Sequence, residues 1–385
     1  MTLKLITANH AAGMAATMAG RANREALGFG GGVYPITPQT ECIEFLAKQD
    51  IEKGHLVRVE SEHSAMAVCI GTSIAGARSF TASSSNGLAY MTENVVSAAM
   101  YRLPIVMMAV NRTLGPPWNI WVDHGDTLLL RDAGWVQLYC EDNQEVFDLI
   151  LMAFRVAEDP SVLLPVMVCQ DAFVLSHTMV MTEIPTQDLV DAFLPDLDLP
   201  HRIAESAITI GGLDFPHEVE VHRLQLMEAM ERVPRVYAKA QDEFEAQFGR
   251  RPPEPVVSYR NEDAEILLVS LGTTAATARA AVDAAREKGI KAGSVRVAMF
   301  RPLPEAALRA AVGGVRKVAV IDRDTCPGLG GILWAEVRGV LGEAMVQNYI
   351  IGLGGGDVRP EHLLSLIEEM HSRERAEAPL VKEVG

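Results

Sequence analysis

The sequence predicts an α/β fold, with a doubly wound parallel sheet in the first domain and a second, smaller α/β domain after it. Over roughly the first 180 residues, short apolar runs alternate with longer stretches of helical character. One run, 104–110 (Pro-Ile-Val-Met-Met-Ala-Val), is apolar throughout, which is typical of a parallel strand buried on both faces. The alternation stops in a proline-rich interval and resumes near residue 265, so two α/β units are expected.

The elements of the first unit follow from apolar spacing and from the signals at helix ends. The stretch 9–26 is rich in alanine and methionine, which favour helices, and 60–75 begins with carboxylates, which a helix N-terminus stabilises. Helices are expected at 9–26, 38–49, 60–75, 88–100 and 144–157. Strands are expected at 56–59, 79–82, 104–110 and 165–169.

A linker separates the two units. Prolines interrupt regular structure between about 178 and 216, and 219–248 is then expected to form one or two charged helices. Beyond the Arg-Arg-Pro-Pro-Glu-Pro segment at 250–255, strands are expected at 265–272, 292–300, 317–322 and 345–351, and helices at 273–288, 304–312 and 330–341. We therefore expect domains at 1–180 and 263–385, joined by a linker at 181–262.

Composition and charge exclude several classes of function. The 385 residues carry a formal net charge of −16, with 49% hydrophobic and 22% charged residues. Nucleic acids and anionic membrane surfaces are bound by clusters of lysine and arginine, so neither partner is expected. No apolar run approaches the roughly 20 residues of a membrane span. The first residues lack the apolar core of a signal peptide, so a cytoplasmic location is expected.

The cysteines are scattered along the chain and include no C-x-x-C pair: Cys42, Cys69, Cys140, Cys169 and Cys326. This pattern predicts reduced thiols rather than a disulfide framework. It also lacks the closely spaced thiolates that usually hold an iron–sulfur cluster, so any such cluster is expected on another chain.

The stretch 32–41 (Gly-Val-Tyr-Pro-Ile-Thr-Pro-Gln-Thr-Glu) predicts a rigid turn with an exposed hydroxyl at its centre. Pro35 and Pro38 fix their own φ and push the preceding residues toward extended geometry. Thr37 is thereby held at the start of the helix expected at 38–49, and a helix N-terminus suits an anionic ligand. An ordinary proline-rich turn with Thr37 as N-cap is the alternative interpretation.

The same stretch carries a family resemblance. The run 34–38 (Tyr-Pro-Ile-Thr-Pro) resembles the substrate loop of the 2-oxoacid:ferredoxin oxidoreductases, the family that includes pyruvate synthase. The run 60–65 resembles the family's segment that contacts the thiamine ring, and 75–85 resembles the strand and loop that follow it. The runs 102–106, 111–112 and 116–121 resemble the α chain of the multi-subunit pyruvate enzymes, and the resemblance covers nearly the whole chain. It implies a thiamine-pyrimidine-binding domain followed by a domain similar to the C-terminal domain of transketolase.

The resemblance implies that Glu62 is the catalytic carboxylate that contacts thiamine diphosphate. In the family, a glutamate in a Ser-Glu-x-x-Ala context lies beside N1′ of the aminopyrimidine ring, and 61–65 matches that context. Glu60 is a weaker candidate because it precedes the matching motif. A solvated carboxylate that only stabilises the helix N-terminus is the alternative interpretation.

Arg112 is expected to bind the carboxylate of the substrate. It directly follows the apolar strand at 104–110, and open α/β sheets bind ligands at the carboxyl ends of their strands. A guanidinium can hold a carboxylate by two hydrogen bonds, and Thr37 would add a hydroxyl. The rest of the loop is expected to contact the substrate too: Tyr34, Pro35 and Ile36. A surface salt bridge is the alternative for Arg112.

The segment 118–126 is expected to wall the substrate pocket, with Trp121 and Val122 against the substrate. Pyruvate-specific relatives tend to have Trp-Gly-Asp-His-Gln-Asp where this chain has Trp-Val-Asp-His-Gly-Asp at 121–126. Val122 adds bulk and Gly125 removes a long polar side chain, so a bulkier 2-oxoacid such as phenylglyoxylate is an alternative to pyruvate. The two changes could also leave the substrate unaltered.

The sequence does not predict a metal site on this chain. The histidines and aspartates near the motifs, His63, His124, Asp123 and Asp126, lack the spacing of a metal site and are expected to be structural. The family's motif for Mg²⁺ and the diphosphate, Gly-Asp-Gly with a later asparagine, is absent, and its nearest imitation is 355–358 (Gly-Gly-Asp-Val).

These absences imply one subunit of a larger enzyme. The resemblance implies a β chain with the thiamine diphosphate and Mg²⁺ site and a [4Fe-4S] cluster, a γ chain, and a ferredoxin-like δ chain, assembled as a dimer of heteromers. The expected reaction is oxidative decarboxylation of a 2-oxoacid with coenzyme A, which passes two electrons to ferredoxin or another acceptor; pyruvate is the default substrate. A non-redox thiamine-dependent decarboxylase or transketolase-like subunit, and a non-catalytic scaffold subunit, stay open as alternatives.

Overall fold

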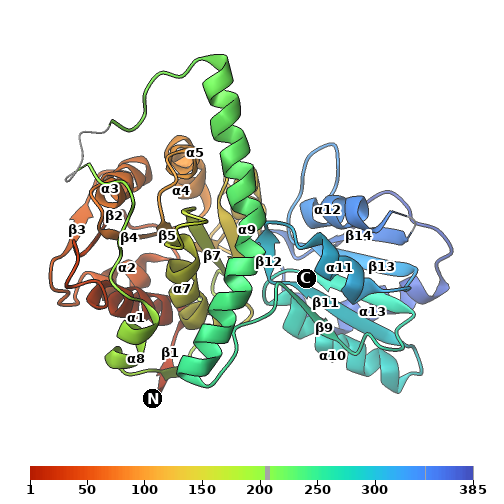
Figure 1. The fold of residues 1–385 in the computed structure, drawn as a ribbon. Helices are drawn as coiled ribbons and strands as arrows, with labels where there is room; N and C mark the ends of the chain where they lie inside the picture. The colour runs from red at the N-terminus through yellow and green to blue at the C-terminus, as the bar shows by residue number, and fades with distance from the viewer. Residues whose placement is uncertain (204–208, 343, 385) are drawn as a thin grey trace.

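The computed structural model describes residues 1–203, 209–342 and 344–384. Two α/β domains lie side by side, and one long helix runs along the first of them (Figure 1). The first domain is built on a seven-stranded sheet with the order β12-β6-β7-β5-β4-β2-β3, and the second on a six-stranded sheet with the order β15-β14-β13-β10-β11-β9. The expected α/β fold with a doubly wound first domain is confirmed.

In the first sheet, every strand except β12 runs parallel to its neighbours. Its strands are β2 (Phe29–Val33), β3 (Gly54–Arg58), β4 (Arg78–Ser83), β5 (Ile105–Asn111), β6 (Val136–Tyr139), β7 (Val166–Asp171) and β12 (Met299–Arg301). The helices of this domain are α1 (Ala8–Arg21), α2 (Thr40–Leu46), α3 (Glu62–Ile74), α4 (Ser85–Tyr90), α5 (Thr92–Met100), α6 (Gly125–Leu129) and α7 (Asn143–Ala157).

Strand β5 shows why the sheet is covered on both faces. Its residues are all buried, and successive side chains enter two different hydrophobic clusters. Val106, Met108 and Val110 pack with residues of α1 and α7. Ile105 and Met107 pack on the opposite face with residues of α3 and α5. An apolar run without alternation is therefore what a central parallel strand requires.

The connection between the domains contains more regular structure than expected. Strand β8 (Val180–Ile184) pairs antiparallel with β1 (Thr2–Ile6) in a separate two-stranded sheet. Helix α8 (Gln187–Phe193) follows, and the expected charged segment forms one helix, α9 (Pro216–Phe248). Figure 1 shows that the first turns of α9 extend past α5. Part of the expected linker, 204–208, lies outside the described residues.

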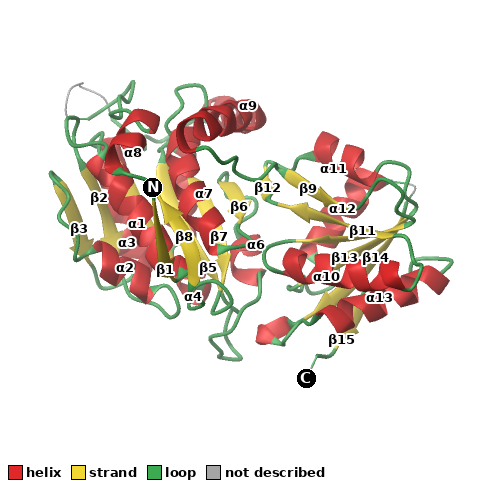
Figure 2. Cartoon of the chain, turned by 90° about the horizontal axis from the view of Figure 1, so that it is seen from below, coloured by secondary structure: helices red, strands yellow, loops and turns green. Residues whose placement is uncertain are grey.

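The second domain alternates strands and helices, and its helices lie on both sides of the sheet (Figure 2). Its elements in chain order are β9 (Val256–Tyr259), β10 (Ile266–Ser270), α10 (Thr274–Glu287), β11 (Ala292–Val297), α11 (Glu305–Val312), β13 (Lys317–Asp322), α12 (Ile332–Leu341), β14 (Met345–Ile351), the 3₁₀ turn η1 (Leu353–Gly355), α13 (Pro360–Ser372) and β15 (Leu380–Lys382). Strand β9 lies in the stretch expected to be linker, and β15 follows the strand that was expected to be the last.

The expectation of a single strand at 292–300 is wrong, because the chain crosses between the two sheets there. Strand β11 belongs to the second sheet and β12 to the first. At the crossing, the Ala298 N–H donates to the Pro255 carbonyl (3.0 Å) and the Ala298 carbonyl accepts from the Tyr139 N–H (2.7 Å). Arg296, on β11, is 3% exposed and pairs with Glu141 and Glu145 of the first domain, each at 2.8 Å. The two domains thus share backbone pairing and a buried ion network.

Strand β2 was not expected, because glycine is depleted in strands. Its sequence is Phe-Gly-Gly-Gly-Val. A Cβ atom on Gly31 would lie 1.9 Å from the Phe80 carbonyl oxygen, and one on Gly32 would lie 2.3 Å from the Ala65 carbonyl oxygen. The glycines therefore allow β4 and α3 to approach the strand closely, a requirement set by residues distant in the sequence.

The expected helix at 88–100 is also divided: α4 ends at Tyr90 and α5 begins at Thr92. The Thr92 hydroxyl donates to the Leu88 and Ala89 carbonyls, which satisfies carbonyls at the end of α4.

Across the residues that the structure describes, no helix combines the length and apolar character needed to cross a membrane.

Candidate active site

Several candidate residues lie at one edge of the first sheet. Parallel strands bring their carboxyl ends to the same edge, and the adjacent order of β5, β4, β2 and β3 places the loops after these strands next to one another. The loop with Thr37 follows β2, Glu62 follows β3, the serine-rich turn 83–85 follows β4, and Arg112 follows β5. Side chains up to 75 residues apart in the sequence therefore meet here.

Glu62 is the first residue of α3. Ser61 caps the helix by accepting from the Ser64 N–H at 3.2 Å, so the Glu62 backbone is fixed at the start of the helix. Its side chain is 8% exposed, and within the described parts of the chain no group donates a hydrogen bond to the carboxylate. A Cβ atom on Gly87 would lie 2.7 Å from Glu62 Oε1, so the glycine leaves room beside the carboxylate.

Glu60 occupies a different environment. It is exposed and accepts a hydrogen bond from the Ser64 hydroxyl, and that bond lowers the pKa of the Glu60 carboxyl. Of the two glutamates in this motif, Glu62 is the buried one with an open acceptor, which is the arrangement that a donor on a bound ring would need.

Arg112 holds the loop 34–38 in place. Its Nη1 donates to the Thr37 carbonyl at 2.9 Å and its Nε donates to the Asn119 carbonyl at 2.7 Å. Burial lowers the pKa of the guanidinium, and Asp126 opposes that shift. Thr37 and Pro35 are exposed, while Tyr34 and Ile36 are half-buried. The guanidinium and the tip of the loop therefore lie together on an open surface.

Asp126 fixes the backbone of Arg112 by a hydrogen bond. Its Oδ2 accepts from the Arg112 and Ser85 backbone N–H groups at 3.0 and 2.9 Å. Its Oδ1 accepts from Asn111 Nδ2 and from the Thr127 N–H. The side chain is fully buried, and burial raises the pKa of its carboxyl to about 7, although four N–H donors favour the ionised form.

The raised pKa of Asp126 predicts a pH dependence of stability. The folded chain holds the proton more tightly than the unfolded chain, so this contribution is complete near pH 4 and is lost as the pH rises through about 7. The stability of wild type relative to Asp126→Asn, followed by thermal unfolding, should therefore fall by about 1.4 kcal/mol per pH unit as the pH rises from 5 toward 7. Parallel pH profiles of the two proteins would contradict this assignment.

The wall segment 118–123 places its side chains unequally. Trp121 is 50% exposed, and its ring lies 4.7 Å from that of Phe173. Val122 is 4% exposed and belongs to the core of the first domain, so its side chain does not lie at the surface of the site. Exposure therefore changes abruptly between Trp121 and Val122, which the sequence does not disclose.

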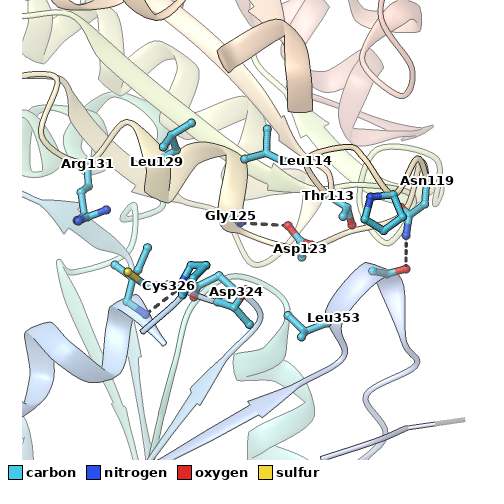
Figure 3. A pocket seen from close by; sticks show the side chains of 15 residues that line it. Thr113, Leu114, Asn119, Asp123, Gly125, Leu129, Arg131, Asp324, Cys326 and Leu353 are labelled. Carbon is cyan, nitrogen blue, oxygen red and sulfur yellow. Dashed lines mark hydrogen bonds between the residues drawn. The ribbon is translucent and has the colours of Figure 1, made fainter. Parts of the chain in front are cut away.

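The second domain also touches this wall (Figure 3). The turn η1 follows β14, and its Gly354 carbonyl accepts from Asn119 Nδ2 at 2.9 Å. A Cβ atom on Gly355 would lie 2.1 Å from Trp121 Cβ, so only glycine permits this approach. The glycine-rich segment 352–356, which overlaps the run 355–358 that imitates a diphosphate motif in sequence, thus serves as a packing surface for the tryptophan.

A cleft of about 610 Å³ opens between the domains beside η1. Its labelled lining includes Thr113 and Asp123 of the first domain and Asp324, Cys326 and Leu353 of the second (Figure 3). Glu62, Thr37 and Arg112 lie outside this lining. The candidate residues therefore lie at the edge of the first sheet and not in this interdomain cleft, with Thr37 exposed, Arg112 half-buried and Glu62 buried.

One histidine of the site, His124, forms a hydrogen bond with a buried aspartate, Asp171. His124 Nε2 lies 2.9 Å from Asp171 Oδ1, and the Thr273 N–H of the second domain donates to Asp171 Oδ2 at 3.1 Å. Burial alone would raise the pKa of Asp171, but His124, Arg323 and Thr273 lower it to about 2. No group of three or more His, Cys, Asp or Glu side chains within the described ranges has the arrangement of a metal site.

Sequence reasoning missed three contributors to the site: Asp126 as the support of Arg112, the turn η1, and the loop after β7 with Phe173 and His177. The same rule that selected Arg112, a polar side chain just past a buried strand, applies to His177 after β7. The contact of η1 with Trp121 gives no local signal, because it depends on the placement of the second domain.

The chain fits one half of a thiamine cofactor. The open acceptor of Glu62, the space above Gly87, and the Ser83 hydroxyl that is buried without a partner within the described residues converge at one place. A planar ring with its own donors would satisfy both oxygens. Among the described residues at this edge, no three His, Cys, Asp or Glu side chains are grouped so that they could hold the metal of a diphosphate.

Two sequence models of protein families match the chain. The model described as "Pyruvate flavodoxin/ferredoxin oxidoreductase, thiamine diP-bdg" matches residues 31–242. The model described as "Pyruvate:ferredoxin oxidoreductase core domain II" matches residues 264–363.

Curated relatives match over nearly the full length. Pyruvate synthase subunit PorA of Methanothermobacter thermautotrophicus is 42% identical over 380 residues, which is 98% of this chain and 97% of the relative. PorA of Thermotoga maritima is 43% identical over 87% of this chain and 88% of its own length. Ketoisovalerate oxidoreductase subunit VorA of Pyrococcus abyssi is 42% identical over 88% of this chain and 87% of its own length.

Solved structures share the fold. A 2-oxoglutarate:ferredoxin oxidoreductase from Magnetococcus marinus, solved with 2-oxoglutarate, coenzyme A and succinyl-CoA bound, superposes with a TM-score of 0.75 at 21% identity. The match covers 96% of this chain and 65% of that one, so this chain spans slightly less than two thirds of its length. A split-gene transketolase, an inactive β4 tetramer, superposes with a TM-score of 0.56 at 14% identity, over 95% of this chain and 98% of that one.

Proposed function

The chain belongs to the pyruvate:ferredoxin oxidoreductase family and is a subunit of a thiamine diphosphate-dependent 2-oxoacid oxidoreductase, and we propose that it is the α subunit that supplies Glu62, Thr37 and Arg112 to a shared active site. The observation that carries this proposal is the hydrogen bond from Arg112 to the Thr37 carbonyl at the same sheet edge as the open carboxylate of Glu62.

Each residue has a distinct task in the proposed reaction. Thiamine diphosphate, when bound, supplies the nucleophilic carbon and the electron sink for decarboxylation. Glu62 would accept a hydrogen bond from N1′ of the pyrimidine and stabilise the tautomer that can take up a proton. Arg112 would bind the substrate carboxylate through Nη2, which donates no hydrogen bond to any other described residue, while the Thr37 hydroxyl orients the same group.

The remaining parts of the active site are proposed to lie on partner chains. The candidate residues occupy an open edge, and the exposed side chains of Tyr90, Trp118 and Trp121 surround it with apolar surface. A β chain would cover this edge with the diphosphate and Mg²⁺ site and a [4Fe-4S] cluster. A γ chain and a ferredoxin-like δ chain would complete the heteromer, with coenzyme A as the acyl acceptor and ferredoxin or another acceptor for the electrons.

Pyruvate is the proposed substrate, and the test is a substrate panel on the native complex, purified without oxygen. Coenzyme A-dependent reduction of a viologen dye should give the highest kcat/KM with pyruvate, ahead of branched-chain 2-oxoacids, 2-oxoglutarate and phenylglyoxylate. The order follows because Trp121 is held against the site by Phe173 and Gly355, which limits space for a bulky substituent.

A preference for a branched-chain 2-oxoacid would replace pyruvate as the substrate. The equal identity to pyruvate synthase and to ketoisovalerate oxidoreductase subunits favours this second candidate. A complex without iron and sulfide, active on a 2-oxoacid but unable to reduce the dye, would contradict the redox function. A complex with no activity on the whole panel would favour a scaffold role.

A further inference from the structure

The loop after β7, residues 172–178, carries polar and aromatic side chains that the proposed chemistry does not use. Phe173 and Ser176 are joined by a hydrogen bond from the Phe173 N–H to Ser176 Oγ at 2.8 Å. The Leu175 N–H donates to the Asp171 carbonyl at 3.1 Å, which ties the loop back to the end of the strand. Since β7 lies beside β5 and parallel to it, this loop stands at the same sheet edge as Arg112.

His177 connects this loop to α2. Its Nδ1 lies 2.8 Å from Ser176 Oγ, and its Nε2 lies 3.1 Å from Glu41 Oε1. Because Ser176 Oγ already accepts from the Phe173 N–H, its own hydrogen is free to bond Nδ1, which leaves the Nε2 hydrogen for Glu41. The His177 ring also lies 4.7 Å from the Phe173 ring, so the imidazole is held on two sides.

The serine, histidine and glutamate have the composition of a hydrolytic triad but not its geometry. Ser176 is 1% exposed, and its oxygen is occupied by the Phe173 N–H. A nucleophilic serine must reach its substrate. The hydrogen-bond chain therefore transmits position rather than activating a nucleophile.

Glu41 and Asn9 link His177 to the loop 34–39 by hydrogen bonds. Asn9 is fully buried, and its Nδ2 donates both to Glu41 Oε2 at 3.0 Å and to the Pro38 carbonyl at 2.6 Å. Gln170 fixes the Asn9 amide by donating to its Oδ1 at 3.0 Å. An unbroken chain of hydrogen bonds thus runs from Ser176 to the carbonyl of Pro38, the neighbour of Thr37.

The same loop contacts the opposite wall of the site. Phe173 lies between His177 and Trp121, with ring centroids 4.7 Å from each. The carbonyl of Thr37 is bound by Arg112, and the carbonyl of Trp121 accepts from the Thr113 N–H at 3.0 Å. The loop 172–178 therefore spans the distance between the two segments that flank the guanidinium.

We propose that His177 is a positioning residue for the 2-oxoacid: through Glu41 and Asn9 it holds the loop 34–39 against Arg112, and through Phe173 it sets the place of Trp121. The proposal rests on the assignment of the loop 34–39 and Arg112 to substrate binding. His177 touches neither the cofactor nor the reacting atoms. Its loss should weaken the binding of the substrate and leave the chemical step intact.

Steady-state kinetics of the anaerobically purified complex test this role. His177→Ala should raise the KM for the 2-oxoacid about tenfold, with kcat within about threefold and the KM for coenzyme A unchanged. His177→Gln keeps an N–H donor with comparable reach and should restore the KM to within about threefold of wild type. The double variant His177→Ala with Glu41→Ala should lose less in KM than the two single losses multiplied together, because the two residues share the connection to Asn9 and only the contact of His177 with Phe173 is separate.

A matched histidine provides the control. His222 on α9 also pairs with a carboxylate, its Nδ1 lying 2.8 Å from Asp214 Oδ2, but it lies outside the site. His222→Ala should keep the wild-type KM. An unchanged KM in His177→Ala, or equal losses in kcat for every substrate, would overturn the positioning role.

Hydrogen exchange supplies a readout that does not depend on activity. In the intact complex without substrate, amides of 34–41 should exchange faster in His177→Ala than in wild type, while amides of α9 should not change. Unaltered exchange at 34–41 would overturn the proposed connection. A wild-type complex without 2-oxoacid activity would instead contradict the proposed function, and the exchange experiment would still decide whether His177 holds the loop.

Discussion

Replacing Glu62 with alanine or glutamine should lower the kcat of the assembled enzyme by at least about 1,000-fold. The carboxylate is 8% exposed, and its acceptor is free of other partners within the described chain, so a bound pyrimidine would be its natural hydrogen-bond partner. Glutamine keeps the shape but loses the negative charge that stabilises the reactive tautomer. The measurement is 2-oxoacid-dependent dye reduction by the purified complex, with saturating thiamine diphosphate.

Glu60→Gln is the matched control for Glu62. Glu60 lies two residues earlier, is exposed, and accepts from Ser64, so its replacement should change kcat by less than about twofold. Both variants should assemble with their partner chains, as judged by subunit stoichiometry after gel filtration. An active, correctly assembled Glu62→Ala enzyme would remove Glu62 from the mechanism, and loss of activity in Glu60→Gln alone would transfer the role.

Replacing Arg112 with alanine should lower kcat/KM for the 2-oxoacid by about 100- to 1,000-fold, mainly through KM. The variant loses the partner of the substrate carboxylate and also the bond that holds the Thr37 carbonyl. Arg112→Lys should recover only part of this loss, since an ammonium group cannot reproduce the planar, two-pronged geometry of guanidinium. Initial rates over a range of 2-oxoacid concentrations separate the effect on KM from that on kcat.

Arg251→Ala is a suitable control for Arg112. Its guanidinium is bound to Asp242, Glu245 and Glu254 at the surface, so its removal should leave both constants within about twofold of wild type. If Arg112→Ala changed kcat and left KM unaltered, the guanidinium would act on the chemical step rather than on binding of the carboxylate.

The sequence predicted best those elements whose character is local. Strands β13 and β14 have the bounds expected from their apolar runs, and β5 differs by one residue at each end, because a strand buried on both faces is apolar throughout. Strand β2 could not be predicted in this way, since its glycines are required by the close approach of the Ala65 and Phe80 backbone, which are distant in the sequence. The division of 292–300 between two sheets likewise depends on the packing of whole domains.

The candidate site divides in the same manner. Motif resemblance and position after a strand selected Glu62, Thr37 and Arg112, and the structure brings Arg112 and Thr37 into contact. The burial of Val122, the support by Asp126 and the relay through His177 arise from side chains that meet only after folding. Sequence spacing does not predict such contacts. The position of His177 after a buried strand, however, could have selected it as a candidate by the rule that selected Arg112.

Strand β12, which follows β11 in the chain and belongs to the first sheet, has a consequence for folding during synthesis and for truncation of the chain. Residues 299–301 cover the outer edge of β6, so a ribosome must extend the chain about 130 residues beyond the end of β7 before the first sheet is complete. Until then β6 presents unpaired peptide groups, which are a template for aggregation. Neither a truncated fragment ending at the linker nor a split gene cut there would yield an intact first domain, and a cut after residue 301 is the earliest that would preserve it.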